Sequence, residues 1–120
     1  MSLGRSLSLS TLILCGSAQA ALDEQDRREI DGLLTFVENS GCQFIRNGSR
    51  HAPGDARQHL QKKLDYLEKK GLLDSAEDFI ARAATESSLS GKPYQVSCQG
   101  QLQPSSDWLN AELARLRQAL

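Results

Sequence analysis

The sequence lacks any apolar run long enough to cross a bilayer as a helix, which takes about 20 residues. Its most apolar stretch, Leu7–Leu14, is far shorter and lies near the N-terminus. Internal repeats and low-complexity stretches are absent as well. Positive charge is not in excess, because the net charge of the 120 residues is −1. The sequence therefore predicts a protein without a transmembrane segment and without nucleic acid among its partners.

The first twenty residues have the organisation of an export signal. Arg5 precedes the apolar stretch, and the segment Ala18-Gln19-Ala20 provides the small residues of a cleavage site. This pattern predicts a Sec signal peptide over residues 1–20, with cleavage between Ala20 and Ala21. A lipid anchor at Cys15 is disfavoured because a large residue precedes that cysteine. We therefore expect an exported, periplasmic protein.

Removal of this signal leaves two cysteines, Cys42 and Cys98, in a mature region of residues 21–120. An even number of cysteines in an exported chain predicts a disulfide. A region of this length corresponds to one globular domain. Closing the long loop between the two cysteines would stabilise such a domain by roughly 4 kcal/mol in the loop-entropy model.

Motifs that would indicate metal binding or catalysis are missing. The two histidines, His51 and His59, are too few and too far apart to form a metal site with the cysteines engaged in a disulfide. No Gly-x-Ser-x-Gly context surrounds Ser87, Ser88 or Ser90. We therefore expect no metal, no cofactor and no enzymatic activity. A small hydrolase that uses this serine-rich loop is the alternative.

Apolar residues recur with helical spacing in four segments. The first covers residues 23–40, and the second runs from Pro53 to the glycine at position 71. The third begins after Asp74 or Ser75 and precedes a polar loop at residues 87–93. The last is capped by Ser105 or Ser106 and carries a leucine stripe that ends at Leu120, with Trp108 beside it.

Two further segments have the character of short strands. Residues 42–45 and 49–51 flank Asn47-Gly48, which is the strongest local signal for a hairpin, although a loop with a tight turn is nearly as compatible. Apolar residues alternate with polar ones at 94–98, whereas 99–103 reads as a loop. We therefore predict a mainly helical α+β fold, with about four helices and a small two-stranded β patch that carries the disulfide.

The turn at residues 46–51 is the first candidate binding site. It places two guanidinium groups and an imidazole around a polar turn, and an arginine fork suits carboxylate or phosphate. Because the arginines flank the turn, their guanidinium groups can converge on one acidic group. The candidate residues are Arg46, Asn47, Ser49, Arg50 and His51.

The polar loop after the third helix is the second candidate site. It offers several hydroxyl groups and one cation, through Ser87, Ser88, Ser90 and Lys92. The carboxyl end of a helix disfavours anions, which weakens an anion site at this loop.

A series of short motifs, in order along the chain, resembles a family of short exported proteobacterial proteins catalogued as domain of unknown function 5329. The resemblance implies a periplasmic domain with two matching cysteines and no assigned activity or ligand. Where that family often has an aromatic pair after Asn-Gly-Ser, this chain has Arg50 and His51. The motifs are Gly41-Cys42-x-Phe44, Arg46-Asn47-Gly48-Ser49, Asp65-Tyr66-Leu67, Ser75-Ala76-Glu77-Asp78-Phe79-Ile80 and Ser90-Gly91-x-Pro93-Tyr94.

Together these patterns favour a periplasmic, non-enzymatic binding or interaction module. Its partner would be an envelope protein or an anionic ligand. The alternatives are the small hydrolase already named, an inhibitor of a cell-wall hydrolase, and an envelope assembly factor.

Overall fold

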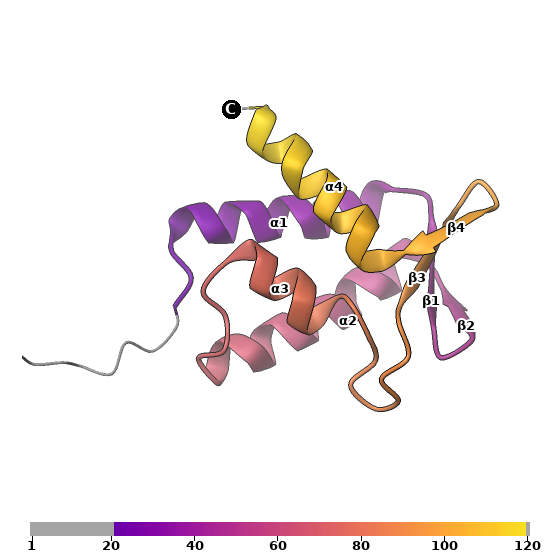
Figure 1. The fold of residues 1–120 in the computed structure, drawn as a ribbon, viewed down its shortest axis with the longest axis horizontal. Helices are drawn as coiled ribbons and strands as arrows, with labels where there is room; N and C mark the ends of the chain where they lie inside the picture. The colour runs from indigo at the N-terminus through magenta and orange to yellow at the C-terminus, as the bar shows by residue number, and fades with distance from the viewer. Residues whose placement is uncertain (1–20, 120) are drawn as a thin grey trace, which may run out of the picture.

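The computed structural model describes residues 21–119. The predicted export signal and Leu120 lie outside the described residues. The described part contains four helices, as predicted, and they lie side by side with a sheet at one end (Figure 1). In chain order the elements are α1 (Glu24–Asn39), β1 (Gln43–Arg46), β2 (Ser49–His51), α2 (Pro53–Lys69), α3 (Ala76–Ala83), β3 (Gln95–Cys98), β4 (Gln101–Pro104) and α4 (Ser105–Gln118).

The first two helices begin and end, and the third begins, where their capping residues predict. Asp23 caps α1 through a reciprocal capping box with Asp26, and Gly41 follows that helix with a φ of +69°. Proline occupies the first turn of α2, where its missing N–H costs nothing. After α2, the N–H of Leu72 donates to the carbonyl of Leu67, which completes a Schellman cap. The side chain of Ser75 caps α3.

The start of α4 differs from the prediction. Neither Ser105 nor Ser106 caps it; the helix begins at Ser105, and the capping position is occupied by Pro104, which has no side-chain cap. Pro104 still pairs with Gln95 in the sheet, and the N–H of Ser105 donates to the carbonyl of Tyr94. The strand therefore runs directly into the helix. Strand pairing, rather than a serine cap, fixes where α4 begins.

The sheet has four antiparallel strands in the order β2-β1-β3-β4, so the predicted two-stranded patch is too small. The hairpin at Asn47-Gly48 is confirmed, since both turn residues have the positive φ values, 51° and 80°, that this turn requires. The region 99–103 is not a loop. Gln99 and Gly100 form a second turn of the same kind, with φ values of 52° and 80°. The sequence pattern missed β4 because its side chains are largely exposed and show no apolar alternation.

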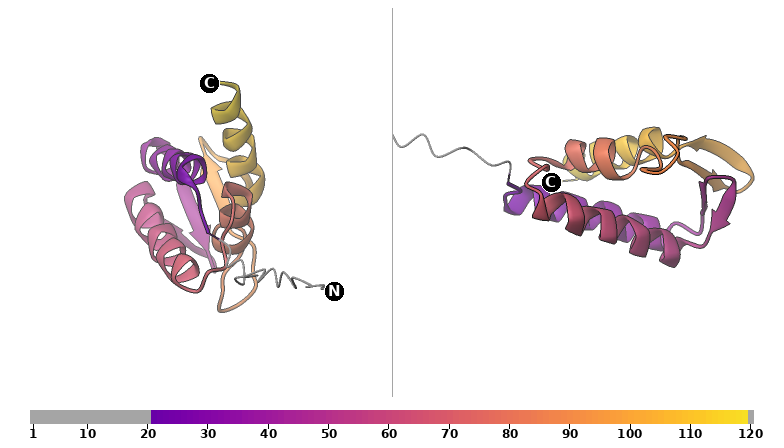
Figure 2. Two further views of the ribbon diagram at one scale, coloured as in Figure 1. Left: turned by 90° about the vertical axis from the view of Figure 1, so that its left-hand side faces the viewer. Right: turned by 90° about the horizontal axis from the view of Figure 1, so that it is seen from below.

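The predicted disulfide between Cys42 and Cys98 is present and joins the start of β1 to the end of β3, with 4.5 Å between the Cα atoms. Behind the sheet, the apolar faces of all four helices meet in one core. Figure 2 shows the arrangement of the helices and the sheet from two further sides. Trp108 closes the edge of this core against Phe36 and Phe44, with ring centroids 4.5 and 5.6 Å away. None of the helices in residues 21–119 is long and apolar enough to cross a membrane.

Candidate functional site

Strand alternation divides the candidate residues of the first turn between the two faces of the sheet. Directly opposed residues of an antiparallel pair project to the same face. His51 is opposite Phe44 and Ser49 is opposite Arg46, whereas Arg50 is opposite Ile45. The predicted convergence of the two arginines on one acidic group is therefore wrong.

The two guanidinium groups accordingly have different partners. The guanidinium of Arg50 donates to the side-chain oxygen of Gln43, 3.1 Å away, on the face that Ile45 shares. The guanidinium of Arg46 contacts His59 of α2 on the other face. Of the two arginines, only Arg46 faces α2.

The two candidate loops, which were predicted as separate sites, are joined by hydrogen bonds. The side-chain amide of Asn47 donates to the hydroxyl of Ser87 at 3.2 Å, and the hydroxyl of Ser90 donates to the amide oxygen of Asn47. Ser87 is buried, and its hydroxyl also accepts the backbone N–H groups of Leu89 and Ser90. The serine hydroxyls thus hold the loop against the hairpin. Lys92 is exposed at the far side of this loop.

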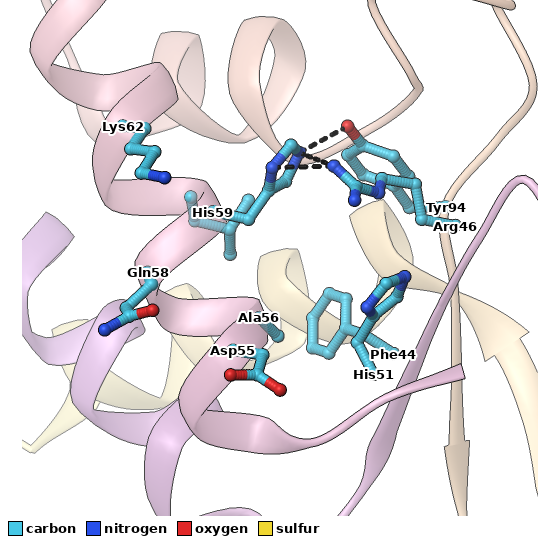
Figure 3. Close-up of a pocket in the computed structure, with 10 residues that line it drawn as sticks. Phe44, Arg46, His51, Asp55, Ala56, Gln58, His59, Lys62 and Tyr94 are labelled. Carbon is cyan, nitrogen blue, oxygen red and sulfur yellow. Dashed lines mark hydrogen bonds between the residues drawn. The ribbon is translucent and has the colours of Figure 1, made fainter. Parts of the chain in front are cut away.

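Between the hairpin, α2 and this loop lie two adjoining hollows of about 210 and 370 Å³. They share four residues, and we treat them together as the cleft (Figure 3). Phe44, Ala56 and Leu60 are buried side chains that line the first hollow. The polar side chains that line the cleft are Arg46, Asn47, Ser49, His51, Asp55, Gln58, His59, Lys62, Lys63, Ser87, Ser88 and Tyr94.

A chain of hydrogen bonds crosses the cleft. Nη1 of Arg46 lies 2.8 Å from Nδ1 of His59 and 3.2 Å from its Nε2. A guanidinium can only donate, so the closer nitrogen, Nδ1, is the acceptor and Nε2 carries the proton of the neutral ring. Nε2 then donates to the hydroxyl oxygen of Tyr94, 3.0 Å away (Figure 3).

Lys63 completes the chain from the other side. Its ammonium donates to the hydroxyl oxygen of Tyr94 at 3.2 Å and to the backbone carbonyl of Glu86 at 3.1 Å. The oxygen of Tyr94 therefore accepts two hydrogen bonds, which use both of its lone pairs. Its own proton remains available for an acceptor in the cleft.

The charge states follow from burial and from the neighbouring cations. Burial, followed by the charges of Arg46 and Lys63, lowers the pKa of His59 to about 4, so the ring is neutral at neutral pH. Burial also lowers the pKa of Lys63, and the charge of Arg46 lowers it further. Burial raises the pKa of Tyr94, which keeps its phenol protonated. The cleft thus combines two neutral hydrogen-bonding groups with the charge of Arg46 and Lys63.

No described carboxylate forms a salt bridge with Arg46 or Lys63. Nε2 of His51 is buried in the same region and has no hydrogen-bond partner among the described residues. No group of three metal-ligating side chains occurs within residues 21–119. What the cleft offers chemically is a set of donors for an anionic group.

Of the nine candidate residues selected from the sequence, six line the cleft: Arg46, Asn47, Ser49, His51, Ser87 and Ser88. Arg50, Ser90 and Lys92 do not line it. Sequence reasoning missed the roles of His59, Lys63 and Tyr94, which form the hydrogen-bonded centre of the cleft. His59 and Lys63 are four residues apart and therefore lie on one flank of α2, and this spacing is the sequence pattern that could have identified them. Tyr94 has no such pattern, because burial in the core is enough to explain an apolar residue at its position in the alternating segment.

The sequence matches a family model over almost the whole described region. The model of a family of unknown function, DUF5329, matches residues 24–117, which include the disulfide, the cleft and all four helices. The chain is 33% identical over 84 residues to the uncharacterised protein YfeK of Salmonella typhimurium, covering 69% of this chain and 68% of that protein. No solved structure matches. The chain belongs to the DUF5329 family.

Proposed function

We propose that this protein is an exported, non-enzymatic binding module that recognises an anionic group in the cleft. The observation that carries the proposal is the arrangement around His59 and Tyr94. Two cations, Arg46 and Lys63, are held there by neutral partners and by no carboxylate of the described residues. A pair of cations without a salt bridge to a described carboxylate favours an anionic ligand in a partly enclosed site, because water screens the interaction less there than at an open surface.

The donors have the geometry that such a ligand needs. A guanidinium has five N–H donors, and Nη1 is the only nitrogen of Arg46 that contacts His59. The remaining donors, together with the proton of Tyr94, suit a planar carboxylate or a phosphate. The neutral state of His59 also matters, because a neutral ring can accept from Arg46 and thereby orient it.

Export is supported by the leader-like residues 1–20 and by the disulfide, a bond typical of oxidising compartments. The non-enzymatic part of the proposal is supported by the serine loop. There the hydroxyls of Ser87 and Ser90 bond to Asn47 and to backbone amides, and no histidine of the described residues forms a hydrogen bond with them. The proposed partner is a small anionic ligand or an acidic group of an envelope protein.

The test is a titration of the mature protein with acetate and with inorganic phosphate, followed by amide chemical shifts in NMR. We expect shifts confined to the cleft, at His59, Lys63 and Tyr94, and their loss in Arg46→Gln. Arg50→Gln is the matched control, because it removes the same charge from the same hairpin on the opposite face. Shifts that are absent from the cleft, or equal in the two variants, would refute the proposal.

A further inference from the structure

The cleft does not end at Lys63. It continues along α2 into a hollow of about 270 Å³ that is lined by Tyr66, Leu67 and Arg82, between α2 and α3. His59, Lys63 and Ser88 line both this hollow and the cleft, so the two adjoin. We call the hollow the α2–α3 groove. A ligand longer than a single anionic group would follow it.

Charge is separated between the two flanks of α2. On the flank that faces α1, Glu68 is paired with Arg27, 2.8 Å away. On the groove flank, Lys62 and Lys63 project with Tyr66, and neither lysine forms a salt bridge with a described residue. Arg82 adds a cation from α3. The groove flank is therefore basic, although the whole chain has a net charge of −1.

The groove also has exposed apolar surface. Tyr66 is 61% exposed and lies beneath the ammonium of Lys70, which is 5.7 Å from the ring centroid. Leu89, which lines the cleft from the loop above the groove, is 95% exposed. These two side chains offer a bound segment apolar contacts beside the basic ones.

We infer that the cleft and the α2–α3 groove together bind an extended acidic segment of a protein, with one carboxylate at Arg46 and an apolar side chain against Tyr66 and Leu89. The inference rests on the proposed function, because the same cleft takes the anionic group. An extended chain projects successive side chains to opposite sides, so a segment that alternates acidic with apolar residues offers acidic groups to one wall of the groove and apolar groups to the other. An anionic glycan would satisfy the lysines but leave Leu89 without a partner. A flat bilayer would not reach the hydrogen-bond donors inside the cleft.

The test measures binding of a fluorescent octapeptide that alternates glutamate with leucine, by anisotropy, to the mature protein. Replacing the leucines of the peptide by serine should weaken binding by about tenfold or more, and so should the double variant Tyr66→Ser, Leu89→Ser. Leu102→Ser is the control, since Leu102 is an exposed leucine of β4 that lines neither the cleft nor the groove. Its affinity should equal that of the unchanged protein.

The outcomes separate this inference from the proposed function. Equal binding of the leucine and serine peptides, with both abolished by Arg46→Gln, would overturn the peptide inference and leave the anion site in place. Tighter binding of dextran sulfate or of phosphatidylglycerol vesicles than of the peptide would overturn it in favour of a glycan or a membrane. No response to the peptide, acetate or phosphate would overturn both.

Discussion

Removal of Arg117 is the sharpest test of how the helices are held together. This residue lies near the end of α4 and bonds to carboxylates of two other helices. Its guanidinium donates to both oxygens of Glu29 in α1, at 2.8 and 3.1 Å, and to both oxygens of Glu77 in α3, at 2.9 and 2.8 Å. Arg117 therefore joins three helices through one side chain.

The two carboxylates contribute unequally because they differ in exposure. The side chain of Glu29 is only 9% exposed, so its carboxylate has little water to replace a lost partner, and the loss should cost about 1.5–3 kcal/mol. The side chain of Glu77 is 55% exposed, and a pair of that kind is worth about 0.2–1 kcal/mol. We expect Arg117→Met, which keeps the aliphatic length, to destabilise the fold by roughly 2–4 kcal/mol.

The assay is thermal unfolding at neutral pH, where this loss should lower the Tm by roughly 8–30 °C for a domain of this size. Glu77→Gln is the matched control and should cost about 1 kcal/mol or less. A Tm for Arg117→Met within a few degrees of the unchanged protein would refute the reasoning. It would mean that water already satisfies Glu29.

The pH dependence gives a second check. Hydrogen bonds from Arg117 lower the pKa of Glu29 and of Glu77 below their usual value of 4.5. A carboxylate whose pKa is lowered in the folded state stabilises the fold fully when the pH is above its usual pKa. This stabilisation is lost as the pH falls through the lowered pKa. In Arg117→Met the hydrogen bonds from Arg117 that lower the pKa of Glu29 are lost, so its carboxyl should protonate at a higher pH than in the unchanged protein. The difference in stability between the two proteins should therefore narrow as the pH falls from 7 to 3.

Two further predictions concern the disulfide and the cleft. Cys42→Ala with Cys98→Ala, which opens a link across 56 residues of sequence, should lower the free energy of unfolding by roughly 4 kcal/mol; an unchanged denaturant midpoint would contradict this. The ring of His59 should titrate near its pKa of about 4 in NMR. Because that pKa is lowered, part of the stability should be lost as the pH falls from about 6.5 towards 4. The variant His59→Gln should not show this pH-dependent loss of stability. A His59 ring that titrates near 6.5 would contradict the burial argument.

The helices were predictable because local chemistry sets their limits. The capping box at Asp23, the proline at the start of α2 and the glycine after each of the first two helices act within one turn of the chain. β4 was not predictable in the same way. Its pairing with β3 depends on a Gln-Gly turn that is not a strong hairpin signal and on exposed residues without apolar alternation. The start of α4 was missed for the same reason, because it depends on where β4 stops pairing.

The sequence predicted the two loops that line the cleft, but not that they lie together. The residues of the hairpin and of the serine loop are about 40 positions apart, and only the bonds of Asn47 to Ser87 and Ser90 bring them together. The centre of the site needs three separate segments at once. Arg46 comes from β1, His59 from α2, and Tyr94 from the segment before β3. No periodicity within one segment reports a contact of this kind.

The resemblance implied an aromatic pair where this chain has Arg50 and His51, and the fold decides what such a pair could do. Neighbouring residues of a strand project to opposite faces. Position 51 lies opposite Phe44 in the cleft, whereas position 50 lies opposite Ile45 on the other face. An aromatic pair at these positions therefore cannot form one continuous contact surface. An aromatic ring at position 51 would extend the apolar wall that Phe44 provides, whereas the histidine of this chain brings a polar nitrogen into the cleft. Variation at position 51, and not at position 50, should therefore change what the cleft binds.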